Sequence, residues 1–183
     1  PAKWTTRLCP EVIEHFNEFP SFKDNIYFHM NFKVPIPVMT TTYALRAVCT
    51  LKVLNNVASS LNSTMYLHAG SHLGAVLHGG PIPWDDDVDV FIPYEKRDEL
   101  YALCEGTGFE LETGVRLRCV MAHNGLKIWI QDPDTVKETQ NEVDWYSPFI
   151  DVFMLRRNAT AVIETYLNGT QRDENYKIED YFP

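Results

Sequence analysis

The segment 68–93, HAGSHLGAVLHGGPIPWDDDVDVFIP, decides the fold, because it places a group of carboxylates at the start of an apolar stretch. From residue 87 onward, acidic and apolar residues alternate, which predicts a β-strand with Asp87 and Asp89 on the same face. Carboxylates at positions i and i+2 of a strand lie about 6–7 Å apart at Cα, so they can bind one divalent cation, and without it they repel each other. The strand therefore predicts a metal site on Asp87 and Asp89.

Upstream of this strand, the sequence predicts a short strand over 66–69, a glycine turn and a helix over 71–77. Backbone N–H groups at a helix N-terminus carry partial positive charge, and glycine lets a phosphate approach them closely. Residues 78–84 are too rich in glycine and proline for a helix or a central strand, so we expect them to form a pocket wall. The candidate nucleotide- or phosphate-binding residues are Gly70, Ser71, His72, Gly74, His78, Trp84 and Asp85.

Some of these residues have a structural alternative. A histidine near an apolar strand, such as His72 or His78, more often makes a structural hydrogen bond than acts as a ligand or base. Trp84 is expected either to stack on a base or ring or to pack in the core. The acidic run also fits a solvated loop, in which Asp86, on the face opposite to Asp87, would brace the backbone.

A second acidic position lies in the segment 149–155, FIDVFML, which is apolar on both faces except for Asp151. An ionised aspartate in a strand buried on both faces is costly without a partner, and this strand contains no lysine or arginine. We therefore expect Asp151 to share one metal ion with Asp87 and Asp89 and to join them as a catalytic residue. A hydrogen bond from the core backbone to Asp151 is the alternative.

The motifs LGA at 73–75, HGG at 78–80 and IPWDDDVD at 82–89 together resemble the signature of the LicD family, which includes fukutin and fukutin-related protein. The resemblance extends over roughly residues 45–183. It implies an α+β fold of the DNA polymerase beta-like nucleotidyltransferase type, with a mixed sheet flanked by helices. It also implies a transferase that uses Mg²⁺ or Mn²⁺ to move a phosphocholine- or phosphoribitol-type group from a CDP-linked donor to a glycan acceptor, with release of CMP.

Two features depart from the family pattern. The family usually has an arginine at the position of Leu77, so a phosphate contact is expected to be missing here. Arg116, Arg118 and Lys127 are candidates to replace it, although solvated strand charges are the simpler expectation. Family members also generally continue beyond the position of Pro183, which predicts a truncated sequence or a reduced protein. A catalytically weak binding domain is therefore one alternative function.

A Golgi glycosyltransferase with an Asp-x-Asp motif and a nucleotide-sugar donor is another alternative. It fits less well, because in such enzymes the motif usually ends a strand, whereas here Val88, Val90 and Ile92 continue one strand through the motif. A requirement for a nucleotide sugar instead of a CDP donor would identify this class.

The composition predicts a single acidic globular domain. With 183 residues, 45% of them hydrophobic, the chain is long enough to bury a substantial core. A formal charge of -9 argues against extensive binding to a nucleic-acid polymer, which needs clustered lysine and arginine. No apolar run approaches the ~20 residues of a membrane span, and no signal-peptide core opens the sequence. Any membrane anchor is expected outside this chain.

Secondary-structure patterns divide the remaining sequence. Residues 1–42 are broken by prolines, which predicts an irregular N-terminal segment packed on the core, followed by a LicD-like domain over 43–183. The Asn-Gly pair at 124–125 predicts a hairpin. The other expected elements are helices over 43–61 and 94–105, strands over 109–112, 115–121 and 126–131, and an exposed excursion over 131–146 that borders the site.

Three glycosylation sequons begin at Asn62, Asn158 and Asn168, which favours a Golgi or other secretory-pathway lumen, or secretion. Asn158 and Asn168 also fit the start and end of a helix over 159–167. One or two disulfides are expected, with buried free thiols as the alternative, because the cysteines lack zinc-site spacing. These cysteines are Cys9, Cys49, Cys104 and Cys119.

Overall fold

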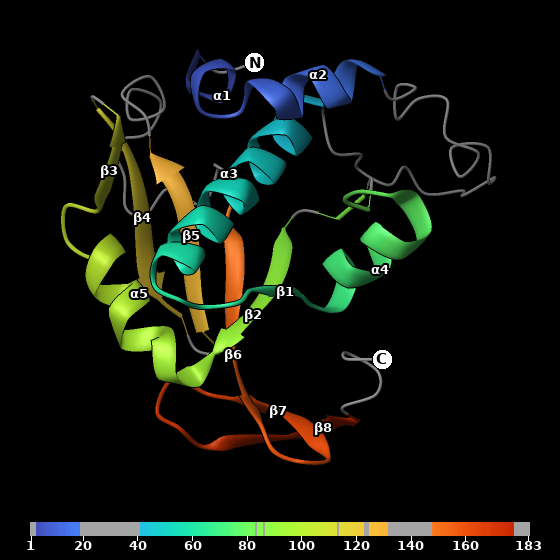
Figure 1. Ribbon diagram of the computed structural model, residues 1–183, viewed down its shortest axis with the longest axis vertical. Helices are drawn as coiled ribbons and strands as arrows, with labels where there is room; N and C mark the ends of the chain where they lie inside the picture. The colour runs from blue at the N-terminus through green and yellow to red at the C-terminus, as the bar shows by residue number, and fades with distance from the viewer. Residues whose placement is uncertain are drawn as a thin grey trace.

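The chain has an α+β fold in which helices pack against one mixed β-sheet (Figure 1). A computed structural model describes residues 3–18, 41–82, 84–85, 87–112, 114–122, 125–131 and 148–177. The helices are α1 (Lys3–Leu8), α2 (Pro10–Glu18), α3 (Thr41–Ser60), α4 (Ala69–His78) and α5 (Arg97–Cys104), with the 3-10 turn η3 (Tyr94–Lys96) before α5. The strands are β1 (Tyr66–Leu67), β2 (Val88–Pro93), β3 (Phe109–Glu112), β4 (Val115–Met121), β5 (Gly125–Gln131), β6 (Ile150–Arg157), β7 (Ala161–Thr165) and β8 (Gln171–Lys177).

The main path of the sheet runs β1-β2-β6-β5-β4-β3 (Figure 1). Strands β2 and β6 pair in parallel, and β5 pairs antiparallel to β6 on its other side. The far end of β6 pairs with β7, which in turn pairs with β8, and these two strands extend the sheet at the lower end of the view. Strand β6 is therefore the centre of the sheet, and every strand that bears a predicted metal ligand lies at or beside it.

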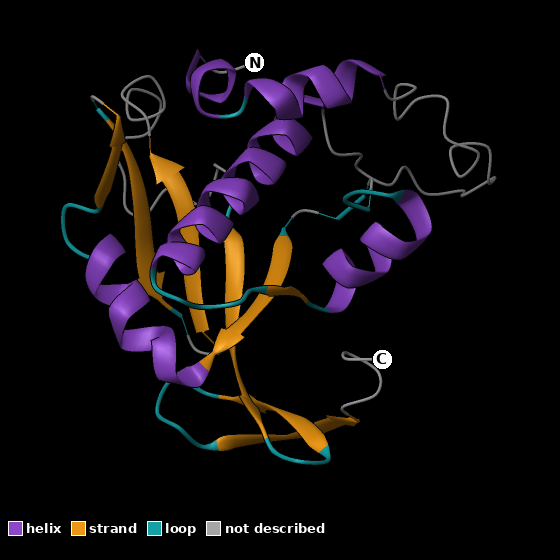
Figure 2. Cartoon of the chain, in the orientation of Figure 1, coloured by secondary structure: helices purple, strands orange, loops and turns teal. Residues whose placement is uncertain are grey.

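Alternation of side chains gives the sheet two different faces. Strand residues such as Val90, Ile128 and Val152 join one buried apolar cluster with residues of α3 and α5, including Leu54 and Leu100. Figure 2 shows α3 crossing the sheet on this side. The acidic positions of β2 and β6 alternate with these core residues, so they lie on the opposite face.

Two disulfides connect the helices to their neighbours. Cys9–Cys49 joins the α1–α2 junction to α3, and Cys104–Cys119 joins α5 to β4. Both pairs are buried in the main apolar cluster. The expected pairing of cysteines is confirmed, and the sequence could not have given the partners because spacing does not determine connectivity.

Most of the predicted elements are present. The helix expected over 43–61 is α3, and the hairpin expected around the Asn-Gly pair is formed by β4 and β5. The helix expected over 94–105 is divided into η3 and α5. The N-terminal segment, expected to be irregular, contains two short helices, and the rest of it lies outside the described residues, as does most of the excursion expected over 131–146.

The helix predicted over 159–167 is wrong, because this segment contains strand β7. Oδ1 of Asn158 accepts backbone hydrogen bonds from Thr160 at 2.8 Å and Ala161 at 2.7 Å, which form a turn rather than a helix cap. Val162 and Ile163 are β-branched and pair with the end of β6. The short apolar run suited either element, and strand pairing decided between them.

The second turn of this region begins at Asn168, whose Oδ1 accepts a hydrogen bond from the Thr170 backbone N–H at 3.0 Å. Gly169 has φ +86°, a left-handed conformation that favours glycine. The sequence signal that predicted a helix stop therefore marks the β7–β8 connection instead. All three sequon asparagines, Asn62, Asn158 and Asn168, are exposed.

Among the helices that the structure describes, none is long and apolar enough to cross a lipid bilayer.

Candidate metal and transfer site

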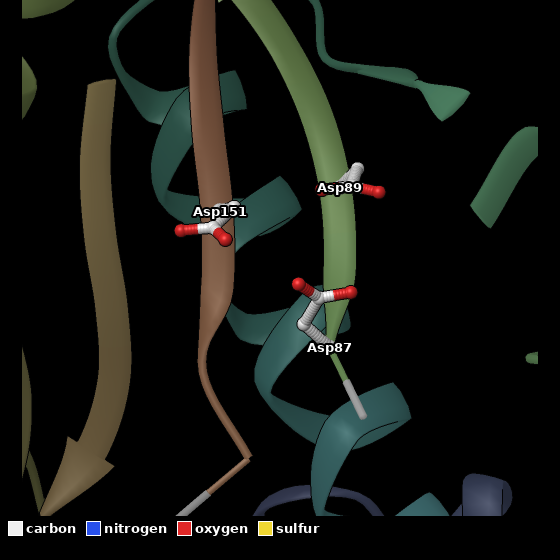
Figure 3. A group of neighbouring side chains, drawn as sticks. All are labelled: Asp87, Asp89 and Asp151. Atoms are coloured by element: carbon white, nitrogen blue, oxygen red, sulfur yellow. The ribbon is translucent and has the colours of Figure 1, made fainter. Parts of the chain in front are cut away.

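Three carboxylates converge on the face of the sheet opposite to α3. Asp87 stands just before β2, Asp89 lies on β2 and Asp151 lies on β6 (Figure 3). One carboxylate oxygen from each residue lies within 4.8 Å of the oxygens of the other two. All three residues are partly buried. The structure thus brings together the three residues that the sequence predicted to share one metal ion.

Strand register produces this convergence. In the parallel β2–β6 pair, Asp89 and Asp151 are Cα partners, so their side chains stand next to each other on the same face. Asp87 precedes Asp89 by two residues and shares that face, because strand side chains repeat with a period of two. Sixty-two positions of sequence separate Asp89 from Asp151, and only the pairing of their strands places them together.

Asp151 has a cationic partner on a neighbouring strand, which corrects the expectation that only a shared metal ion would compensate its charge. Lys127, the cross-strand partner of Asp151 on β5, places Nζ at 2.7 Å from Oδ1 and 2.8 Å from Oδ2. The prediction considered only residues within the strand, whereas the compensating charge comes from the adjacent strand. A metal ion is therefore not needed to explain a carboxylate at this position, although the geometry admits one.

Asp89 is the carboxylate whose protonation is most perturbed. Burial, followed by the neighbouring charges of Asp87, Asp151 and Asp85, raises its pKa from the ordinary 3.8 to about 7. Lys127 acts in the opposite direction with the smallest effect. The site therefore carries more negative charge than its own cation compensates, which is the electrostatic condition for binding an added cation.

The N-terminus of α4 lies against this site. The buried Ser71 hydroxyl accepts a hydrogen bond from the Asp89 N–H at 2.8 Å, and the His68 N–H donates to the Asp89 carbonyl at 3.0 Å. A Cβ at Gly70 would lie 2.5 Å from Oδ2 of Asp85, so a side chain at this position would displace that carboxylate. Ala69 has φ +43°, a strained value for a residue with a side chain. These contacts fix β2 against the start of α4.

The other predicted phosphate-binding residues lie along α4 and the loop after it. Gly74 is buried, and a Cβ there would lie 2.6 Å from the Gly80 carbonyl oxygen, so this glycine allows the loop to pack on the helix. His72 is exposed, whereas half-buried His78 contacts the ring of Trp84, with ring centroids 6.0 Å apart. Trp84 is 43% exposed, which excludes core packing as its sole role.

The basic residues considered as replacements for the family arginine differ in their contacts. Arg116 donates to the Glu110 carboxylate at 3.1 Å, and Arg118 donates to the Gln131 side chain at 2.8 Å. Lys127, by contrast, contacts a member of the acidic cluster directly. Leu77 is 58% exposed.

Glu164, which the sequence pattern does not mark as a site residue, is buried on β7 at 1% exposure. Its Oε2 lies 3.9 Å from Nε2 of His68, which is also buried and packs on Phe91 with ring centroids 3.9 Å apart. A glutamate within the apolar run AVIET is the available signal, but the helix predicted for this run gives it no buried partner. This contact links the β7–β8 extension to the residue that precedes α4.

The donor set fits divalent cations of the hard kind, which bind oxygen ligands. Carboxylate oxygens are the ligands that these ions prefer in proteins, and three of them lie close enough to contact one ion. Among the described residues, these three carboxylates are the one group of acidic, histidine or cysteine side chains whose ligand atoms lie close enough together to bind one metal ion. Asp87, Asp89 and Asp151 are thus the residues that would hold the ion.

Comparison with known protein families identifies a match over residues 62–183 to the LicD/FKTN/FKRP nucleotidyltransferase domain. The matched region contains α4, the acidic cluster and every strand of the sheet. A search of curated proteins returned no match. Since the family match covers well over half of the sequence, the chain belongs to the LicD family, whose members are generally transferases of the phosphotransferase type.

Proposed function

We propose that this protein is a metal-dependent transferase that moves a phosphocholine- or phosphoribitol-type group from a CDP-linked donor to a hydroxyl of a glycan. The convergence of the Asp87, Asp89 and Asp151 carboxylates within 4.8 Å carries this proposal. The type of donor rests on family membership. The formal net charge of -9 is consistent with a small nucleotide partner rather than a nucleic-acid polymer.

Asp87, Asp89 and Asp151 would hold Mg²⁺ or Mn²⁺ at the start of β2 and β6. When bound, the cation supplies positive charge that offsets the donor diphosphate and the charge that develops on departing CMP. The chain itself contributes rigidity, because Ser71 and His68 hold the backbone of Asp89 by two hydrogen bonds. A fixed carboxylate loses little entropy when it binds a ligand.

In the transfer step, the acceptor hydroxyl oxygen forms a bond to the donor phosphorus that carries the alcohol group. The bond from that phosphorus to the bridging oxygen breaks, and CMP leaves with the bonding electrons. The hydroxyl proton passes to a carboxylate oxygen of Asp151, which lies on β6, the strand adjacent to β2. Trp84, exposed beside Asp85, is positioned to stack on a ring of the donor or acceptor.

A secretory-pathway lumen, such as the Golgi, is the location that we propose for this activity. Disulfides Cys9–Cys49 and Cys104–Cys119 support it, because such bonds persist in oxidising compartments. The exposed sequon asparagines are also compatible with passage through that pathway. Glycan acceptors are found in the same compartments.

The decisive experiment measures turnover of CDP-choline and CDP-ribitol with Mg²⁺, Mn²⁺ or excess chelator, alongside UDP- and GDP-sugars. The proposal predicts release of CMP from one CDP-linked donor only when a divalent cation is present. Turnover of a nucleotide sugar instead would identify a glycosyltransferase. Binding of CDP and Mn²⁺ without turnover of any donor would indicate a binding domain. Thermal protection by each ligand provides a second readout, since a ligand stabilises the fold that binds it.

A further inference from the structure

Lys127 places a positive charge beside the acidic cluster, through its ion pair with Asp151. Its ammonium is within 2.8 Å of both oxygens of Asp151 and lies 3.8 Å from the centroid of the Phe149 ring. Both members of the ion pair are mostly buried, with side-chain exposures of 21% for Lys127 and 18% for Asp151. A buried pair of this kind is more than a surface contact, because its charges are weakly screened by solvent.

The same carboxylate has a second set of neighbours. An oxygen of Asp151 lies within 4.8 Å of oxygens from Asp87 and Asp89, so Asp151 is shared between the ammonium and the candidate metal position. A divalent cation bound by the three carboxylates would compete with the ammonium for Asp151, since both bind through the same oxygens. The ammonium would then need another anionic partner.

A donor phosphate is such a partner. A diphosphate bound to the cation would place anionic oxygens beside the cluster, on the face of the sheet that carries Lys127. The ammonium of lysine ends a flexible four-carbon chain, so it can change partner without movement of β5. Cationic side chains that contact a transferring phosphoryl group stabilise the charge of the transition state.

We propose that Lys127 exchanges partners during the reaction, binding Asp151 in the metal-free protein and a phosphate oxygen of the donor once the cation and the donor are bound. This inference rests on the proposed function, because it takes a diphosphate as the ligand. It assigns Lys127 two tasks. The residue neutralises one carboxylate while the cluster has no metal ion, and it contributes to recognition of the donor afterwards.

The test compares wild-type protein with Lys127→Met, Lys127→Gln and Lys127→Arg. Lys96→Met is the matched control, since Lys96 also forms an ion pair, at 2.9 Å from Glu99, but lies in η3 outside the cluster. Calorimetry measures the affinity for Mn²⁺ alone and then the affinity for cytidine diphosphate at saturating Mn²⁺. Circular dichroism and melting curves establish that each variant is folded, and Lys127→Gln provides a polar alternative where methionine prevents folding.

We expect Lys127→Met and Lys127→Gln to bind Mn²⁺ about tenfold more tightly, because the competing ammonium is gone. The same variants should bind cytidine diphosphate at least about tenfold more weakly at saturating Mn²⁺. Lys127→Arg, which keeps the charge, should restore much of the nucleotide affinity. Lys96→Met should leave both affinities at wild-type values.

Unchanged affinity for cytidine diphosphate in the Met and Gln variants would overturn the exchange, because a purely structural ion pair would affect only Mn²⁺ binding and melting temperature. These binding measurements do not depend on whether the protein has transferase activity. A wild-type protein that binds Mn²⁺ and cytidine diphosphate but transfers nothing would refute the proposed reaction and leave the comparison of Lys127 variants intact. Conversely, active enzyme with unaffected Lys127 variants would refute only the exchange.

Discussion

At the level of single residues, the three carboxylates of the cluster are not equivalent. Asp151 is paired with Lys127, whereas Asp89 is surrounded by carboxylates, and its pKa is raised to about 7. Removal of the negative charge at one position or the other should therefore have opposite effects on the metal-free protein. Stability measurements can therefore distinguish Asp89, whose charge destabilises the metal-free protein, from Asp151, whose charge is compensated by Lys127.

Asp89→Asn should raise the melting temperature of the metal-free protein at neutral pH, because it relieves repulsion within the cluster. Asp151→Asn should lower it, because Lys127 then loses its counter-charge, at a cost of about 1–2 kcal/mol. A change of 1 kcal/mol corresponds to roughly 2–4 °C in a protein of this size. Scanning calorimetry in chelator measures both. Equal shifts for the two variants would contradict the assignment of Lys127 to Asp151.

Activity should respond differently from stability. Asp87→Asn and Asp89→Asn should each reduce cation-dependent release of CMP by about 10²-fold or more, since each removes a charge that would hold the cation. The assay uses whichever CDP-linked donor the wild type accepts, with Mn²⁺ at saturation. Glu110→Gln is a suitable control, because Glu110 pairs with Arg116 outside the cluster. Wild-type turnover in the Asp variants would remove the cluster from the mechanism.

The pH dependence of stability follows from the raised pKa of Asp89. Folding favours its protonated form, so this contribution to stability is fully present below the ordinary pKa of 3.8 and is lost as the pH rises through about 7. In chelator, the melting temperature should therefore fall more steeply between about pH 4 and pH 7 for wild type than for Asp89→Asn. Protection by Mn²⁺ should increase over the same range, because the cation competes with the proton. Superimposable pH profiles of the two proteins would contradict this assignment.

Asp87 and Asp89 could be predicted as a pair because their spacing alone places them on one face of a strand. Asp151 could be predicted because a lone carboxylate in an apolar run needs a partner. Lys127 could not be assigned to it, since cross-strand register is a property of the folded sheet. The sequence indicates which strands carry charges, but the neighbours of those charges depend on strand order.

At the level of elements, the region after β6 shows how one set of residues fits two structures. The segment begins at Asn158, continues with a short apolar run and ends at Asn168-Gly169. This order of residues suits either a capped helix or a strand between two turns. The run AVIET contains β-branched residues, and the exposed edge at the end of β6 provides a partner for it. Local sequence could not decide the outcome, because the deciding hydrogen bonds come from β6.

The turn at Asn158 offers a direct test of glycosylation. Asn158→Asp keeps an acceptor oxygen for the Thr160 and Ala161 N–H groups but destroys the sequon, whereas Asn158→Ala removes both. Expressed in a glycosylating host, wild type should show a larger mass than Asn158→Asp, and the same comparison applies at Asn168. Identical masses in all proteins, including Asn62→Asp, would refute the proposed modification.

The same pair of variants measures the turn itself. In a host that does not attach glycans, Asn158→Ala should be less stable than Asn158→Asp by about 1 kcal/mol, because only the former leaves the turn N–H groups without their acceptor. Chemical unfolding of both proteins gives the difference in free energy of unfolding. Equal stabilities would show that the side chain contributes nothing to the turn.

At the level of the whole molecule, the two disulfides close loops of different length. Cys9–Cys49 closes a separation of 40 residues and Cys104–Cys119 one of 15. Chain-entropy arguments assign about 4 kcal/mol to the longer loop and about 3 kcal/mol to the shorter one. The Cys9→Ser/Cys49→Ser double variant should therefore be the less stable, as measured by denaturant unfolding against the Cys104→Ser/Cys119→Ser variant. The reverse order would mean that contacts in the unfolded state or the cavities left behind outweigh chain entropy.

The order of strands in the sheet has a consequence for synthesis of the protein on the ribosome. Strand β6 lies between β2 and β5, yet both of those strands are translated before it. Until residues 150–157 emerge, the nascent chain carries two halves of a sheet, each with an unpaired edge, and such edges are where chains aggregate or recruit chaperones. Insertion of β6 closes both edges in one event and delivers Asp151 between Asp89 and Lys127. A nascent chain therefore cannot assemble the acidic cluster before β6 joins the two parts of the sheet, which ties formation of the site to the insertion of this one strand.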